Sequence, residues 1–262
     1  MISSVGNPHV KQLRSLATDR RERRRERSFV LEGVRLVATA LDAGAEITLA
    51  LFAPDQLAAL PAGQALLARL ERLPYCYEAA PQVVASAADT VTPQGVVAAA
   101  RWPVVKAGPP GLVLVIDAVQ DPGNVGTLLR SAEAVGVAEV ICTRGTADVY
   151  SPKVVRAAMG AHFGLALRAD VDAADLGAAL GALPNVYAAA SEATMPYYAA
   201  DWRQPAALIV GNEANGIGEA ALAVATKQIS IPMLGRAESL NAAVAGSVVM
   251  FEALRQRARG RS

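Results

Sequence analysis

Three loops of this 262-residue chain combine glycines with polar side chains in a pattern typical of a ligand-binding site. Each loop follows or ends an apolar run that predicts a strand of a parallel sheet, and such sheets bind ligands at the carboxyl ends of their strands. Glycine lets the backbone approach a ligand, and exposed N–H groups can hold an adenosine or a carboxylate. The loops are DAVQDPGNVG at 117–126, GNEANGIG at 211–218 and IPMLGRAESLN at 231–241.

The common nucleotide-binding fingerprints are missing from these loops. The sequence contains no G-x-x-x-x-G-K-[ST], which excludes a P-loop, and no G-x-G-x-x-G follows the first strand of either half. A dinucleotide-dependent oxidoreductase is therefore weakly supported, although a parallel sheet would suit one. The two cysteines and two histidines predict neither a disulfide framework nor a zinc site, so we expect no metal.

The elements that must position these loops alternate between strand and helix in both halves of the chain. The Pro- and Gly-rich stretch at 101–111 interrupts the alternation, so we expect one domain at 1–102, a linker at 103–110 and a second domain at 111–262. The first domain is predicted to have helices over 9–27, 34–41 and 57–73 and strands near 47–54, 75–77 and 95–99. The second is predicted to have strands near 112–117, 139–143, 163–169, 185–190, 206–211 and 229–232, and helices near 125–134, 151–160, 172–182 and 239–257.

Positive charge is concentrated at the start of the chain. Residues 1–35 carry nine basic and four acidic side chains, a charge of +5, which leaves −4 for the rest of a chain whose net charge is +1. Such a segment favours contact with a polyanion, although a run of charges is more often a solvated helix face. No apolar stretch approaches the ~18 residues that a membrane-spanning helix needs, and no secretory signal is recognised. We therefore expect a cytoplasmic protein with no membrane partner.

Taken together, the three loops resemble the three motifs of the SpoU (TrmH-type) 2'-O-ribose RNA methyltransferases. The motifs occur in the family's order as DPGNVGTLLRSAEAVGV, LIVGNEANGIG and ISIPMLGRAESLNAAVAGSVVMFE. Segments of the first hundred residues, SVGNPHVKQLRSL, FVLEGVRLV and QGVVAA, resemble the L30e-like substrate-binding domain of these enzymes. The resemblance implies an α/β protein with a small L30e-like domain and a C-terminal α/β-knot (SPOUT) domain built on a mostly parallel sheet.

The resemblance also implies a homodimer that uses S-adenosyl-L-methionine to methylate a ribose 2'-hydroxyl. Ribosomal RNA of the 23S type is favoured over tRNA, by analogy with RNA-binding relatives of the L30e-like domain. A tRNA 2'-O-methyltransferase and a non-catalytic RNA-binding protein on the same fold remain alternatives. The final helix is almost continuously apolar over 242–251, which exceeds what one covered face requires and favours a two-fold interface.

The motif positions imply roles for individual residues. Arg130 is the family's proposed base, but a guanidinium rarely loses its proton, so we expect it to bind the neighbouring phosphate and lower the pKa of the hydroxyl. The catalytic candidates are Asn124, Arg130, Glu213, Ser239 and Asn241. The cofactor-binding candidates are Gly211, Ile231 and Leu240. The RNA-binding candidates are Lys11, Arg20, Arg21, Arg23, Arg24, Arg25 and Arg27.

Four of the five catalytic candidates also have a purely structural interpretation. Asn124 and Ser239 could be helix N-caps, and Arg130 could pair with Glu133 at i+3. Glu213 could be a solvated loop acid. The order of the three motifs favours function for Asn124, Arg130 and Asn241 and leaves Ser239 and Glu213 open.

Overall fold

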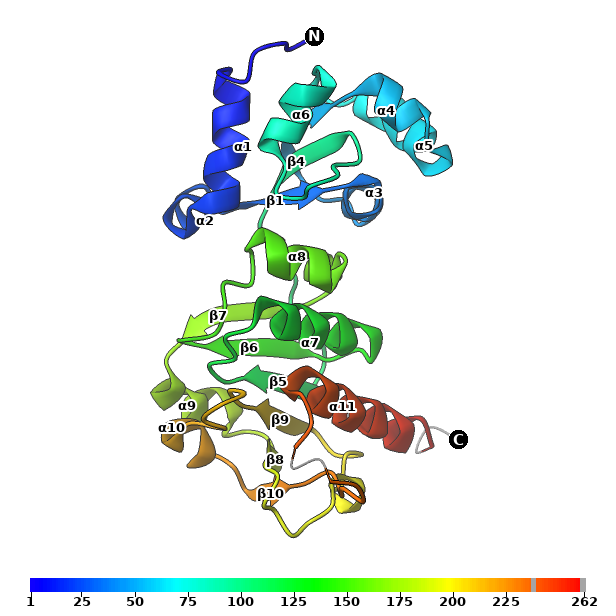
Figure 1. Ribbon diagram of the computed structural model, residues 1–262. Helices are drawn as coiled ribbons and strands as arrows, with labels where there is room; N and C mark the ends of the chain where they lie inside the picture. Colours follow the sequence, from blue (N-terminus) through cyan, green and yellow to red (C-terminus); the bar gives the residue numbers. More distant parts are fainter. Residues whose placement is uncertain (237–238, 260–262) are drawn as a thin grey trace. The chain divides into compact units, whose positions relative to one another are not determined.

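The computed structural model describes residues 1–236 and 239–259, and the chain forms two compact units (Figure 1). The first consists of Met1–Val104 together with Tyr150–Phe163, and the second of Val105–Val149 and the chain from Gly164 onward. The expected domains were continuous along the sequence, whereas residues 150–163, expected in the second domain, pack with the first unit. They do so because helix α8, Pro152–Ala158, contacts strand β1, Ser28–Glu32, and the ring of Tyr150 packs against that of Phe29.

The first unit is built on a four-stranded sheet in the order β1-β4-β2-β3. Strand β4 runs antiparallel to both of its neighbours, and β2 and β3 are parallel. The other strands are β2 Ile47–Phe52, β3 Cys76–Glu78 and β4 Val96–Arg101. The helices are α1 Pro8–Thr18, α2 Arg20–Glu26, α3 Val34–Asp42, α4 Pro54–Ala58, α5 Pro61–Leu70 and α6 Pro81–Ala87, the last of which the sequence analysis did not anticipate.

Two helices that we expected to be continuous are broken. The helix predicted over 9–27 divides at Asp19, whose extended backbone ends α1 and whose side chain accepts a hydrogen bond from the Arg21 N–H at the start of α2. The helix predicted over 57–73 is replaced by α4 and α5, which begins at Pro61, because proline cannot continue the hydrogen bonding of a preceding helix. The apolar face of α1 is buried as its spacing predicts.

The second unit has a six-stranded parallel sheet in the order β10-β8-β9-β5-β6-β7, which confirms the predicted α/β class. Its strands are β5 Leu112–Ile116, β6 Glu139–Thr143, β7 Leu167–Val171, β8 Asn185–Ala189, β9 Ala206–Val210 and β10 Lys227–Ile229. Its helices are α7 Pro122–Ala134, α9 Leu176–Leu180, α10 Glu219–Leu222 and α11 Ala242–Arg259. Short 3₁₀ turns lie at Ala173–Asp175 and Tyr197–Ala199, and another at Ala161–Phe163 belongs to the first unit.

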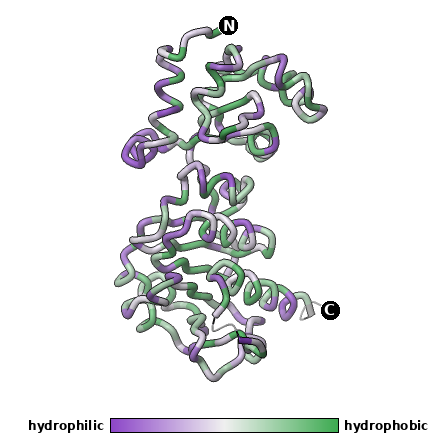
Figure 2. Tube along the Cα trace, viewed as in Figure 1, coloured by the Kyte–Doolittle hydropathy of each residue, from purple (hydrophilic) through white to green (hydrophobic). Residues whose placement is uncertain are grey.

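Apolar strands are buried and the charged helix α2 is hydrophilic, as their residues predict (Figure 2). Strands β5 and β9 are buried throughout, as expected for parallel strands covered on both faces, and Figure 2 colours α2 as hydrophilic. Helix α11 packs on α7, and Gly246 permits this approach because a Cβ there would lie 2.5 Å from a methyl carbon of Leu128. Since all six strands are parallel, the loops after β5, β9 and β10 leave the same edge of the sheet.

Two features are absent from the described residues. None of their helices is long and apolar enough to cross a bilayer. Within 1–236 and 239–259, no group of three or more His, Cys, Asp or Glu side chains is arranged to hold a metal ion.

Candidate functional site

A chain of hydrogen bonds links one side chain from each of the three glycine-rich loops. The Nδ2 of Asn241 donates to the Oδ1 of Asn124 at 2.9 Å, and the Nδ2 of Asn124 donates to Glu213 Oε1 at 2.7 Å. Asn124 thus uses both ends of its amide, and Glu213 accepts as a carboxylate. These three catalytic candidates therefore form one unit.

Asn124 and Ser239 are not helix N-caps, so the structural interpretation of these two candidates is wrong. Asp121, not Asn124, caps α7, because its Oδ1 accepts from the Asn124 N–H at 2.9 Å. Ser239 does not cap the last helix, which begins at Ala242 rather than at the predicted position. Asn241 takes that place, since its Oδ1 accepts from the backbone N–H groups of residues 243 and 244.

Loop 211–218 is held in place by two residues that the sequence analysis missed. Asp117, buried at the end of β5, accepts from the hydroxyl of Thr143 at 2.7 Å and from the N–H of Gly218 at 2.8 Å. Asn212 donates from Nδ2 to the carbonyl of Ala118 at 2.8 Å, and its Oδ1 accepts two backbone N–H groups of its own loop. An acid directly after a continuous apolar strand was the available signal for Asp117.

Gly211 has a structural reason to be glycine. A Cβ at this position would lie 2.5 Å from the carbonyl group of Gly216 and from the N–H nitrogen of Ile217. The loop closes on itself there through paired backbone hydrogen bonds between Asn212 and Gly216. A side chain at position 211 would therefore open the loop that carries Glu213.

A pocket of about 850 Å³ lies at the carboxyl edge of the second unit's sheet. It is lined by the loops after β8, β9 and β10 and by the first turns of α11. All three cofactor-binding candidates line it, as do three of the catalytic candidates. These are Gly211, Ile231 and Leu240, and Glu213, Ser239 and Asn241.

The pocket lining suits a cationic nucleoside better than a phosphate. Its described residues include the carboxylates of Glu192 and Glu213 but no lysine, arginine or histidine. Apolar side chains such as Ile229 and Val249 offer a surface for an aromatic base. S-adenosylmethionine carries an adenine, a sulfonium and an ammonium group, and the donor set fits it. A dinucleotide would place its phosphates against carboxylates, which weakens the oxidoreductase alternative.

Arg130 stands apart from the hydrogen-bonded chain. It lies six residues after Asn124 on α7, roughly 9 Å further along the helix axis and about 120° around it. The side chain is exposed and makes no hydrogen bond or ion pair within the described part of the chain, so the alternative interpretation, a pair with Glu133, does not hold. Arg130 is therefore available to a ligand outside the pocket.

The basic segment divides into structural and exposed side chains. Arg23 is buried, and its guanidinium donates to the carbonyls of Leu16 and Ala17 at 2.6 and 3.0 Å, where it closes the end of α1. Arg23 was expected to bind RNA, but its buried guanidinium stabilises the fold instead. Arg25 pairs with both Glu22 and Glu26. The remaining candidates are exposed: Lys11, Arg20, Arg21, Arg24 and Arg27.

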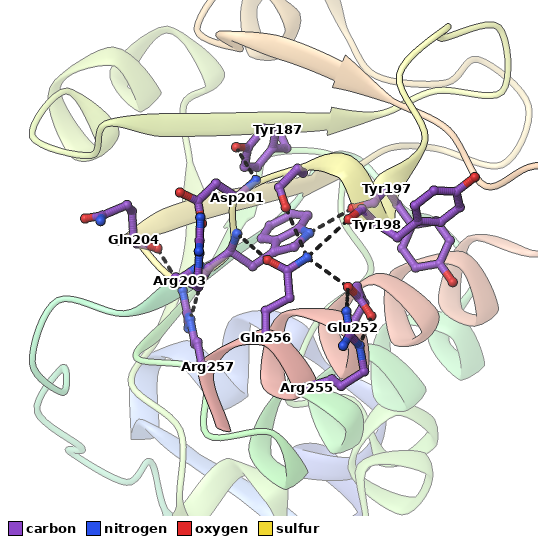
Figure 3. A network of polar contacts seen from close by, with 12 residues as sticks. Tyr187, Tyr197, Tyr198, Asp201, Arg203, Gln204, Glu252, Arg255, Gln256 and Arg257 are labelled. Carbon is purple, nitrogen blue, oxygen red and sulfur yellow. Dashed lines mark hydrogen bonds and ion pairs between the residues drawn. The ribbon is translucent and has the colours of Figure 1, made fainter. Parts of the chain in front are cut away.

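A second polar network fixes the end of α11 and thereby the position of its start at the pocket (Figure 3). Gln256 accepts from the Trp202 N–H and donates to the carbonyl of Ala200 at 3.1 Å, and Arg257 donates to the carbonyl of Trp202 at 2.7 Å. A hydrogen bond from Arg203 lowers the pKa of Asp201 in the same segment. The helix is thus tied to the connection between β8 and β9.

Two family models match the chain. Residues 111–251 match the SpoU rRNA Methylase family, and residues 7–98 match the MRM3-like substrate binding domain. The first match covers both hydrogen-bonded asparagines and the pocket, and the second covers most of the first unit, including α2.

Individual relatives are similar over almost their whole length. The chain is 34% identical to the 23S rRNA (guanosine(2553)-2'-O)-methyltransferase RlmP of Bacillus subtilis, covering 95% of this chain and 97% of the relative. It is 30% identical to the 23S rRNA (uridine(2479)-2'-O)-methyltransferase of Streptomyces viridochromogenes, with 98% and 92% covered. Its fold is similar to the crystal structure of the SpoU methyltransferase AviRb from the same organism in complex with AdoMet. The TM-score is 0.84 at 27% identity, with 96% and 98% covered.

Proposed function

Because the chain belongs to the SpoU rRNA methylase family, we propose that it methylates a ribose 2'-hydroxyl of 23S-type ribosomal RNA, with S-adenosylmethionine as methyl donor. The observation that carries this proposal is the hydrogen-bonded chain of Asn241, Asn124 and Glu213, which joins the three family motifs at the rim of a pocket free of basic residues in its described lining. A non-catalytic RNA-binding protein would not need these three hydrogen-bonded side chains beside the pocket.

The chemistry requires a hydroxyl to lose its proton while oxygen, methyl group and sulfur are held in line. The bound cofactor supplies a methyl group on a positively charged sulfur. Loop 211–218 and Leu240 hold the nucleoside, and Asn124 holds Glu213 and Asn241 in register. The exposed hydroxyl of Ser239 orients the ribose. Arg130 binds the adjacent phosphate and lowers the pKa of the 2'-hydroxyl.

We propose that the enzyme works as a homodimer through α11. Val244, Phe251 and Leu254 are 48%, 50% and 39% exposed, at a spacing that places them on one side of the helix. The opposite side, with Val249, Met250 and Ala253, is buried against the protein's own fold. Such an apolar face supports a two-fold interface, and Arg130 of one subunit could then serve its partner's site.

The trefoil knot of the SPOUT fold and a cytoplasmic location also belong to this proposal. Support for the knot comes from the order of the six parallel strands and from the convergence of the loops after β9 and β10 with α11 on one pocket. Support for the location comes from a bacterial relative that acts on ribosomal RNA.

Transfer of labelled methyl groups to unmodified 23S rRNA and tRNA transcripts, followed by nucleoside analysis, tests the reaction. We expect a labelled 2'-O-methylnucleoside from 23S rRNA. Label on a base would refute the assigned acceptor, and label in tRNA alone would favour the alternative substrate. Absence of label together with absence of S-adenosylmethionine binding would favour the non-catalytic alternative.

Light scattering of Phe251→Arg tests the interface. We expect this variant to be monomeric. The control is Leu60→Arg, which places the same charge on an apolar residue of the first unit that is 38% exposed, and we expect it to remain dimeric. A monomeric wild-type protein would contradict the proposed dimer.

A further inference from the structure

A second pocket, of about 550 Å³, opens at one end of the first unit's sheet, and nothing described so far uses it. It is framed by the beginnings of β2 and β3 and by the end of β4, three neighbouring strands. It is also lined by the end of α3 and by the turn that leads into β3. Its lining residues include Glu46, Ile47, Thr48, Pro74, Tyr75 and Arg101.

Two irregularities of the backbone meet in this pocket. The pairing of β2 with β4 shifts register between Ile47 and Leu49, so that Thr48 is the extra residue of a β-bulge. Tyr75 has a φ of +66°, a left-handed conformation that is unfavourable for a bulky side chain. Bulges and strained backbone cluster at binding sites, where they redirect side chains, and here both line one cavity.

The side chain that the strained backbone presents is an exposed aromatic ring. Tyr75 is 61% exposed, although its backbone carbonyl is held by a hydrogen bond from the Ala50 N–H. A flat apolar ring in solvent beside a cavity is a stacking surface, and unpaired nucleobases stack on such rings in RNA-binding proteins. The bulged Thr48 lines the same cavity, and because its hydroxyl donates to the carbonyl of Ala99 at 3.3 Å, the hydroxyl oxygen is left as an acceptor for the edge of a base.

Positive charge for a nucleic-acid backbone lies next to the pocket. Arg101 lines it, but its guanidinium pairs with Glu46 at 3.6 Å and donates to the carbonyl of Glu26, the last residue of α2, at 2.6 Å. Arg101 therefore adds little net charge, and the positive charge comes from Arg27 and the exposed arginines of α2. The exposed Arg27 is joined to the same strand end, since its carbonyl accepts from the Trp102 N–H at 2.7 Å. The strand order places α2, Arg101 and Tyr75 in a row that spans three strand spacings, roughly 14 Å.

We propose that this pocket binds an unpaired nucleobase of the RNA substrate, stacked on Tyr75, while the neighbouring phosphates lie against Arg27 and the exposed arginines of α2. The inference rests on the proposed function, because it takes the ligand of this pocket to be the RNA substrate. It adds a nucleotide-binding site that lies outside the methyl-transfer pocket and contributes to affinity without taking part in the reaction.

Substitutions at position 75 test the site with the full-length protein and an unmodified 23S rRNA transcript as the probe. Tyr75→Gly removes the ring and also relieves the positive φ, so a loss of RNA binding in this variant is not caused by a strained fold. Tyr75→Phe keeps the ring and is the conservative control. Val91→Ala, at an apolar residue 99% exposed in the same unit, controls for loss of surface apolar area.

We expect Tyr75→Gly to weaken RNA binding about 5- to 150-fold, the range for loss of one stacked base. Tyr75→Phe and Val91→Ala should bind within about twofold of wild type. Affinity for S-adenosylmethionine and the melting temperature should not fall in any of the three. A transcript substituted with 5-iodouridine or 5-iodocytidine should, on irradiation, cross-link to the peptide that contains Tyr75.

Equal RNA affinity of Tyr75→Gly and wild type, or cross-links confined to other peptides, would overturn the inference. This failure is distinguishable from failure of the proposed function, because methyl transfer by the wild-type enzyme is measured separately. A wild-type protein that binds 23S rRNA through Tyr75 but transfers no methyl group would keep the site and refute the reaction.

Discussion

Substitution of Asn124 by alanine should weaken cofactor binding although Asn124 does not line the cofactor pocket. Its amide holds Glu213 and Asn241, both of which do line it, by hydrogen bonds of 2.7 and 2.9 Å. In Asn124→Ala, Glu213 loses its hydrogen bond to the amide, and Asn241 loses one contact but keeps the two backbone N–H groups that it caps. We therefore expect an effect on S-adenosylmethionine affinity that is transmitted through these two side chains.

The size of the effect follows from the two bonds. A hydrogen bond to a charged acceptor contributes roughly 1.5–3 kcal/mol and a neutral one roughly 0.5–1.5 kcal/mol. Both bonds are exposed, so water compensates part of each, and we expect a net loss of about 1–2 kcal/mol. This corresponds to a 5- to 30-fold increase in Kd, which isothermal titration calorimetry measures directly.

A double-mutant cycle separates this coupling from independent effects. If Asn124 acts through Glu213, adding Asn124→Ala to Glu213→Ala should cost less than it does in the wild type, with a coupling energy of about 1 kcal/mol. Asn215→Ala is a matched control, because it lies in the same loop and its side chain makes no hydrogen bond to the described residues. Additivity within about 0.5 kcal/mol would show that the side chains act separately and would refute the reasoning.

Three further outcomes are expected. Arg130→Lys should reduce turnover roughly 100-fold or more while S-adenosylmethionine affinity is kept, and near-normal turnover would exclude a role for the guanidinium. Gly211→Ala should destabilise the loop by about 1–3 kcal/mol and abolish the thermal shift with S-adenosylmethionine. Gly235→Ala, where a Cβ meets none of the described residues within 4 Å, should behave as wild type. Burial, reinforced by Asp170, raises the pKa of Cys142 to about 12, so native protein at pH 8.5 should leave this thiol unalkylated by iodoacetamide. Because the thiol ionises more easily in the unfolded chain, its contribution to stability is complete below about pH 9 and should decline as the pH rises towards 12.

Much of the fold was accessible from local patterns. The apolar runs at 112–117 and 206–211 predicted buried parallel strands, and the structure places β5 and β9 there, side by side. Breaks caused by single residues were missed, since the cap at Asp19 and the proline at position 61 compete with a helical pattern that continues past them. The burial of Arg23 was also missed, because charge alone does not reveal that a carbonyl-rich helix end lies beside it.

The residue types of the candidate site were determined by the sequence, because the three motifs carry them in order. Which of them touch was decided by the tertiary structure alone. Asn124 meets a partner 89 residues away and another 117 residues away, and only the order of parallel strands brings their loops to one edge. Asp117 became recognisable as the residue that holds loop 211–218 once β5 and β9 were paired. Local sequence sets the conformation of each loop, but hydrogen bonds between loops depend on how the whole chain packs.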